Sequence, residues 1–138
     1  MALASKSRWI GLVLCFAACS STPGSADLTA WDQARVTAIA QQLAEASVGW
    51  EAAVLREPEA GPRLNQNARA LHEQSATLAA HLAKGDGHDG TLDYYRGLRE
   101  LADDTQEMLP QAAFAQLSLN AWTKVSDPLG RLAPYYER

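Results

Sequence analysis

Hydrophobic residues recur at alternating steps of three and four along most of the chain, a spacing that puts them on one face of an α-helix. Four such segments follow one another, and no stretch alternates between apolar and polar residues as a strand would. The predicted helices span about 29–56, 62–84, 91–109 and 111–133. Their predicted inward residues, in that order, are Val36, Ile39, Leu43, Ala46, Trp50 and Ala53; Leu64, Ala68, Leu71, Ser75, Leu78 and Leu82; Tyr95, Leu98, Ala102, Thr105 and Leu109; and Phe114, Leu117, Ala121, Val125, Leu129 and Leu132.

Prolines and glycines mark the boundaries of these helices. Pro58 stops the first helix, and Pro62 is a favourable first-turn residue for the second. The second helix ends at Gly85, where a glycine-rich loop over 85–90 begins. Pro128 falls inside the fourth helix, where its missing backbone donor and the clash of its ring predict a kink or a break.

Four amphipathic helices joined by short connections favour an all-α domain, an antiparallel up-down-up-down four-helix bundle over residues 29–138. Many of the predicted inward residues are alanines, so the helices are expected to approach one another closely. Asp27 or Thr29 is placed to cap the first helix, with Asp32 three residues after Thr29 in a capping-box-like position.

A different pattern occupies the first 19 residues. Two basic residues, Lys6 and Arg8, precede an apolar run over 9–18. The run ends in small residues before a cysteine, in the order Phe16, Ala17, Ala18 and Cys19. This segment resembles the lipobox signal of bacterial lipoproteins. The resemblance implies that residues 1–18 are cleaved off, and that a diacylglycerol on the thiol of Cys19 anchors the mature protein to a membrane.

Two other interpretations of this segment stay open: a plain secretory signal and an uncleaved anchor. The anchor is disfavoured because the apolar run is shorter than the roughly 20 residues that span a bilayer. In lipoproteins of Gram-negative bacteria, Asp after the cysteine commonly retains the protein in the inner membrane, but here Ser20 follows. The resemblance therefore implies the periplasmic face of the outer membrane. Residues 19–28 then form the lipidated cysteine and a flexible tether of roughly 27 Å when extended.

Charge and cysteine content narrow the function classes. Without residues 1–18 the chain has 10 basic and 16 acidic residues, a net charge of −6. An acidic domain without a basic stripe argues against nucleic-acid binding and against electrostatic attachment to anionic lipids. Cys19 is the only cysteine after the predicted cleavage point, so no disulfide is expected within the mature chain.

The sequence contains no catalytic motif, and a non-enzymatic protein is expected. It has no glycine-rich phosphate loop, no nucleophile elbow and no His-Glu-x-x-His zinc pattern. His72 and His81 fall on opposite sides of the second predicted helix and cannot share a metal ion. No metal site and no cofactor is predicted. The carboxylates of the third helix are expected to form a solvated face: Glu100, Asp103, Asp104 and Glu107.

The alternative function is a bundle that binds a small ligand, a metal or a haem between its helices. Met108, the only methionine after the predicted cleavage point, could serve as one axial ligand of a haem with His81 or His72 as the other. However, Met108 and His81 fall near opposite ends of the predicted bundle, and His72 falls in the middle of its helix. The loop over 86–90 offers oxygen donors for a cation and fails the EF-hand spacing.

Five aromatic residues are expected to gather at one end of the bundle. In an up-down-up-down arrangement the starts of the first and third helices meet the ends of the second and fourth, at the end where the tether attaches. Amphipathic aromatic side chains suit a protein or bilayer interface, and they equally suit the closing layer of a small core. The candidate partner-binding residues are Trp31, Tyr94, Tyr95, Tyr135 and Tyr136.

These features together predict a membrane-anchored helical lipoprotein that docks a protein partner in the cell envelope. Small helical lipoproteins include the secretion-system pilotins, and the similarity to them is one of size, class and predicted address. Within the aromatic set, Tyr135 and Tyr136 are expected to contact the partner without being needed for folding. The sequence leaves the partner's identity and the oligomeric state open.

Overall fold

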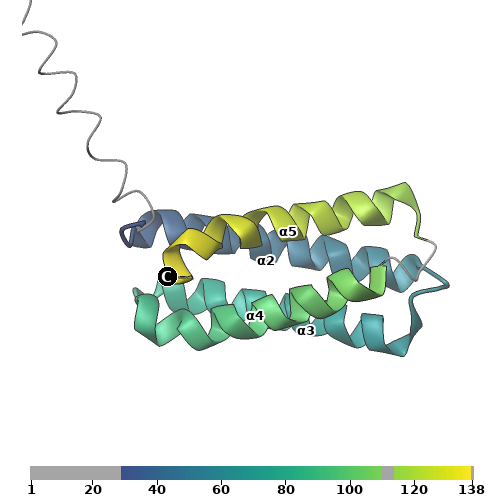
Figure 1. Ribbon diagram of the computed structural model, residues 1–138, viewed down its shortest axis with the longest axis horizontal. Helices are drawn as coiled ribbons and strands as arrows, with labels where there is room; N and C mark the ends of the chain where they lie inside the picture. Colours follow the sequence, from purple (N-terminus) through teal and green to yellow (C-terminus); the bar gives the residue numbers. More distant parts are fainter. Residues whose placement is uncertain (1–28, 110–113, 138) are drawn as a thin grey trace, which may run out of the picture. The chain divides into compact units, whose positions relative to one another are not determined.

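The computed structural model describes residues 29–109 and 114–137 of the chain. This part is an all-α four-helix bundle (Figure 1), which confirms the predicted fold class. Its helices are α2 over Gln33–Arg56, α3 over Gly61–Ala83, α4 over His88–Met108 and α5 over Gln116–Tyr136. Cys19 and the predicted signal and tether lie outside the described residues. None of the four described helices is both long enough and apolar enough to cross a membrane.

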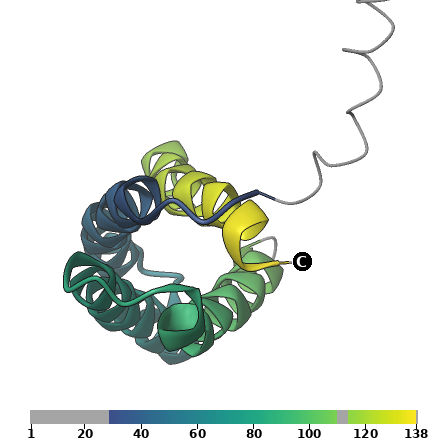
Figure 2. The same ribbon diagram turned by 90° about the vertical axis from the view of Figure 1, so that its left-hand side faces the viewer.

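The four helices form a ring in the order α2, α3, α4, α5 (Figure 2). Successive helices run in opposite directions. Gln33 at the start of α2 hydrogen-bonds Leu82 at the end of α3, and Thr91 near the start of α4 hydrogen-bonds Tyr136 at the end of α5. Short connections favour this arrangement, because each helix then lays its apolar face against its neighbours in the chain.

The apolar stripes of α3 and α4 fall where the spacing predicts. All of the predicted inward residues of the second and third helices are buried. The hydroxyl groups within these stripes bond to their own helix: Ser75 donates to the carbonyl of His72, and Thr105 donates to the carbonyl of Leu101. A buried hydroxyl with such a partner avoids the cost of an unsatisfied polar group.

The start of α2 is capped by Asp32. Its Oδ1 accepts a hydrogen bond from the backbone N–H of Arg35 at 3.1 Å, which satisfies one of the free donors of the first turn. Thr29 lies three residues before the capping position, so the prediction of Thr29 as the cap is wrong. Asp27, the other predicted cap, lies outside the described residues.

The connection between α3 and α4 is shorter than the predicted loop. Gly85 adopts a left-handed conformation with φ of +95°, and the backbone N–H of Asp86 donates to the carbonyl of His81 in the Schellman arrangement that ends many helices. α4 then begins at His88, three residues before its predicted start. The first turn of α4 contains Gly90, a poor helix former, and this residue obscures the start in the sequence pattern.

The start of α5 differs most from its prediction. The helix begins at Gln116 rather than near residue 111, and residues 110–113 lie outside the described part. Leu117, predicted to face inward, is 81% exposed, so this prediction is wrong. Ser118 is buried in its place and donates a hydrogen bond to the carboxylate of Glu57 at the end of α2. This bond sets the rotation of the first turn and leaves Leu117 on the outside.

α5 continues through both of its prolines. Pro128 and Pro134 lie inside the helix, so the break predicted as one outcome near Pro128 does not occur. Each proline removes the hydrogen bond to the carbonyl four residues before it. Those carbonyls belong to Lys124 and Gly130, which are both exposed, so water can replace the missing donor.

Candidate functional site

The five aromatic residues predicted to gather at one end of the bundle do so. Trp31 precedes α2, Tyr94 and Tyr95 lie in the second turn of α4, and Tyr135 and Tyr136 end α5. Trp31 stands nearly perpendicular to Tyr135 and Tyr136, with ring centroids 6.4 and 5.4 Å away. Edge-to-face contacts of this kind stabilise aromatic pairs beyond the area they bury. We refer to these five residues as the aromatic end.

Tyr95 and Tyr136 form the centre of the aromatic end. Their rings are stacked, with centroids 4.4 Å apart and planes 8° from parallel. The hydroxyl of Tyr136 shares a hydrogen bond of 2.8 Å with Thr91 Oγ1, and the hydroxyl of Tyr95 donates to Glu137 Oε1 at 2.8 Å. Arg99 Nε lies 3.5 Å from the same carboxylate oxygen. Stacking, two hydrogen bonds and an ion pair thus join α4 to the end of α5.

Burial raises the pKa of both tyrosines. For Tyr95, desolvation is the largest cause of the raised pKa, followed by its hydrogen bond to Glu137 and the negative charge of that carboxylate, while Arg99 acts in the opposite direction. For Tyr136, desolvation raises the pKa and the hydrogen bond with Thr91 partly offsets it. Both side chains are therefore neutral where an ordinary tyrosine begins to ionise.

Most of the aromatic end belongs to the core. Tyr95, Tyr135 and Tyr136 are 1%, 7% and 5% exposed, respectively. Trp31 and Tyr94 are partly buried and are the two members that offer surface to another molecule. Three of the five aromatic side chains therefore close the hydrophobic core, and truncating Tyr135 or Tyr136 would open a hole in it.

Two histidines adjoin the aromatic end, and each is paired with a carboxylate. His81 stacks on Tyr94 with centroids 4.7 Å apart, and its Nδ1 lies 2.6 Å from Asp86 Oδ2. His88 Nδ1 lies 2.8 Å from Asp89 Oδ1. Hydrophobic spacing does not reveal such pairs, because they depend on the turn between α3 and α4.

Gln33 fastens the start of α2 to the end of α3. Its Nε2 donates to the carbonyls of Leu82 and Asp86, each at 2.9 Å. Its Oε1 accepts a hydrogen bond of 2.8 Å from Trp31 Nε1. Because the amide uses both of its donors and its acceptor, it holds the indole ring of Trp31 in one orientation.

A surface hollow of about 660 Å³ lies between α2 and α5. Leu117 lines it and is the most exposed large apolar side chain among the described residues. The spacing placed Ala46, Ala53 and Ala121 among the inward residues, where their small side chains were expected to bring the helices close together, but a hollow remains there. The alanines and the glycine that line it are Ala46, Gly49, Ala53, Ala115 and Ala121.

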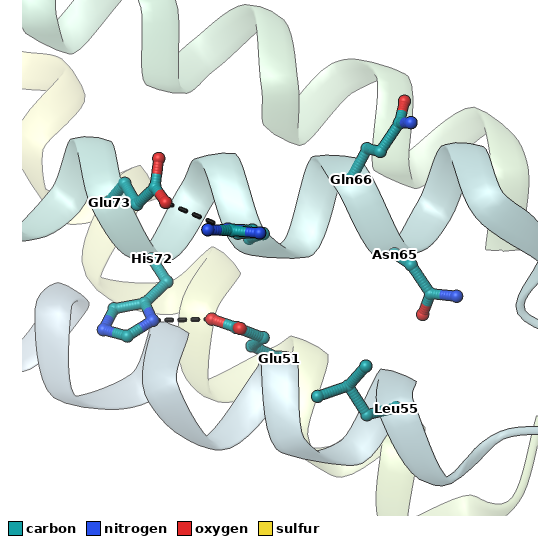
Figure 3. A pocket seen from close by; sticks show the side chains of 7 residues that line it. Glu51, Leu55, Asn65, Gln66, His72 and Glu73 are labelled. Atoms are coloured by element: carbon teal, nitrogen blue, oxygen red, sulfur yellow. Dashed lines mark hydrogen bonds and ion pairs between the residues drawn. The ribbon is translucent and has the colours of Figure 1, made fainter.

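A second hollow, of about 570 Å³, lies between α2 and α3 and is lined mainly by polar side chains (Figure 3). His72 Nδ1 faces Glu51 Oε2 from the neighbouring helix at 2.6 Å. Arg69 Nε donates to Glu73 Oε1 at 3.1 Å along α3. These four side chains are thus paired with one another across and along the two helices.

The residues considered for a haem lie apart. Met108 lies beside the start of α3, in a hollow that Gly61 and Arg63 also line, whereas His81 lies in the last turn of the same helix. Within residues 29–109 and 114–137, no group of three or more His, Cys, Asp or Glu side chains is placed to hold a metal ion.

No protein-family model, curated protein sequence or solved structure matches this chain. Its own residues and geometry are therefore the basis for a function.

Proposed function

We propose that this chain is a lipid-anchored protein of the bacterial outer membrane, facing the periplasm, whose four-helix bundle docks another envelope protein and catalyses no reaction. The observation that carries the proposal is the segment in which Lys6, Arg8 and an apolar run precede small residues and Cys19. Ser20 after the cysteine supports the outer membrane over the inner one.

The absence of recognisable catalytic groups supports docking over catalysis. The sequence contains no catalytic motif, and within residues 29–109 and 114–137 no group of three or more His, Cys, Asp or Glu side chains is placed to hold a metal ion. In size, helical class and proposed address the chain is similar to the secretion-system pilotins, which are docking proteins.

The proposed contact surface is the exposed part of the aromatic end, on Trp31 and Tyr94. Gln33 fixes the ring of Trp31, and His81 stacks on that of Tyr94, so both rings are ordered before a partner arrives. Rigid aromatic side chains lose little entropy on binding and are common anchors of protein interfaces. Tyr135 is buried and packs edge-to-face against the ring of Trp31.

The membrane address is tested by following Cys19. Cells that make the full-length chain are grown with radiolabelled palmitate, and Cys19→Ser is compared with the wild type and with Cys15→Ser as the matched control. We expect the label and outer-membrane fractionation in the wild type and in Cys15→Ser, and the loss of both in Cys19→Ser. Label retained without Cys19, or wild-type protein in the soluble periplasmic fraction, would contradict the lipoprotein assignment.

Docking is tested by placing a photo-crosslinking amino acid at Tyr94, at Leu117 or at Thr77 of the full-length protein in living cells. Thr77 is exposed on α3 and gives the background. We expect one discrete protein adduct from Tyr94 above that background. An adduct from Leu117 alone would move the contact to the α2–α5 hollow and overturn the aromatic-end assignment. No adduct from either position would overturn docking.

A native mass spectrum of the purified full-length protein distinguishes docking from ligand binding. We expect the mass of the lipidated chain without a further bound component. A stoichiometric additional mass would identify a small ligand, metal or haem and would replace the docking proposal with the ligand-binding alternative.

A further inference from the structure

The four sides of the helical ring are unequal. α2 packs extensively on both α3 and α5, and α3 packs on α4, whereas α4 and α5 contact each other much less. Figure 2 shows the last residues of α5 running toward α4 at the end of the ring that faces the viewer. The α4–α5 seam is therefore the side of the bundle with the least packing to hold it closed.

The contacts that close this seam at the aromatic end come from two consecutive residues of the α5 end. Tyr136 stacks on Tyr95 and shares a hydrogen bond with Thr91. Glu137 accepts a hydrogen bond from Tyr95 and lies within ion-pair distance of Arg99. The partners Thr91, Tyr95 and Arg99 all belong to α4. Tyr136 and Glu137 therefore attach the end of α5 to α4.

Trp31 holds this pair of residues in place from the side of α2. Its ring lies edge-on to Tyr136 at 5.4 Å, and its Nε1 is bonded to Gln33. Gln33 in turn bonds to the backbone at the end of α3. The position of Tyr136 is thus set by the start of α2 as well as by α4.

In the other half of the seam, one polar contact joins the described residues of α4 and α5, and the same side chain also packs on α2. Trp122 Nε1 donates to Gln106 Oε1 of α4 at 2.8 Å. On its other side Trp122 packs against Trp50 of α2, with ring centroids 5.2 Å apart. The bond to Gln106 would therefore have to break for α5 to leave α4, whereas the packing of Trp122 on Trp50 would keep α5 on α2.

We propose that Tyr136 and Glu137 form a latch that closes the α4–α5 seam, and that the bundle opens along this seam when the latch is released. The remaining three sides stay packed during the opening. The opening exposes core side chains that α4 and α5 bury, such as Leu98 and Val125. Local opening follows the least-packed boundary of a domain, which here is the α4–α5 seam.

The latch is tested by hydrogen exchange with mass spectrometry on the full-length protein in detergent. The test variant is Glu137→Ala, whose side chain is 56% exposed and lies beyond the helix, so the bundle keeps its core. The matched control is Arg131→Ala, which removes a charged α5 side chain that bonds to Gln42 of α2 instead of α4.

We expect Glu137→Ala to raise amide exchange about fivefold for each hydrogen bond lost, in α4 over 91–105 and in α5 over 120–136. Exchange in α2 and α3 stays at the wild-type rate, and Arg131→Ala leaves the seam protected. A rise confined to 133–137 would be fraying of the helix end and would overturn the proposal. An equal rise in all four helices, or no rise at all, would overturn it too.

A second test uses a variant that changes no charged side chain. Tyr136→Phe retains the stacked ring and removes only the hydroxyl that bonds Thr91. We expect it to raise exchange in the same parts of α4 and α5, and we expect Tyr94→Phe, whose ring stacks on α3 instead, to leave them unchanged. Equal exchange in the two phenylalanine variants would refute the role of Tyr136 in the latch.

Discussion

The ring of Tyr95 lies flat against the ring of Tyr136, with 4.4 Å between their centroids and 8° between their planes. The pair joins α4 to the end of α5, the two neighbouring helices with the least mutual packing. Both hydroxyls find a partner, in Glu137 and Thr91, so the stack buries two phenols without leaving a polar group unsatisfied. The stability of this end of the bundle depends on that pair.

Truncating Tyr136 will destabilise the bundle. We expect Tyr136→Ala to lower the free energy of unfolding by about 3–5 kcal/mol, because it leaves a cavity beside Tyr95 and Trp31. Tyr136→Phe keeps the ring and loses one hydrogen bond, so its cost is about 1 kcal/mol. Urea unfolding followed by circular dichroism measures both values. An alanine variant as stable as the wild type would show that the ring is not part of the core.

Alkaline pH will weaken the fold through Tyr95. Its pKa is raised in the folded state by desolvation and by Glu137, so the folded state favours the neutral phenol. The stabilisation is complete below the pKa of an unfolded tyrosine, near 10, and is lost as pH rises from there through the higher folded-state pKa. We expect urea midpoints measured between about pH 8 and about pH 11 to fall more steeply for the wild type than for Tyr95→Phe. An equal fall of the urea midpoint with pH in the two proteins would contradict a raised pKa of Tyr95 in the folded state.

The outward position of Leu117 can be tested by its stability effect. We expect Leu117→Ala to change the free energy of unfolding by less than about 0.5 kcal/mol, as at most exposed positions. Leu129→Ala, on the same helix and 1% exposed, should cost about 2–5 kcal/mol. A large loss for Leu117→Ala would mean that the first turn of α5 is rotated inward, as its spacing alone predicts.

Two glycines should respond to alanine in opposite directions. Gly85 has φ of +95°, where a side chain is strained, so Gly85→Ala should cost about 1–2 kcal/mol. Gly49 lies inside α2, and a Cβ there would meet no atom within 4 Å among the described residues. Gly49→Ala should therefore stabilise the bundle by about 0.5–1 kcal/mol. Thermal unfolding of the two variants gives the comparison, and a gain for Gly85→Ala would refute the left-handed turn.

The aromatic end shows how far sequence reasoning reaches for a candidate site. Helix order and direction follow from short connections, and they bring Trp31, Tyr94 and Tyr136 to one end. The burial of each ring does not follow, because it depends on which neighbour covers it. Trp31 covers Tyr136, and the ring of Tyr136 stacks against Tyr95. The surface expected to contact a partner is therefore limited to Trp31 and Tyr94, the two partly buried members of the aromatic end.

The spacing of apolar residues by itself determined the four helices and most of their buried faces, because a helix has one period and burial must follow it. The stripe from Leu64 to Leu82 is buried at every predicted position for this reason. The rotation of α5 was decided only in the tertiary structure, where the bond between Ser118 and Glu57 turns Leu117 outward. The uneven closure of the ring was decided there too, because the strength of each side depends on how the shapes of two helices match, and no single helix carries that information in its own sequence.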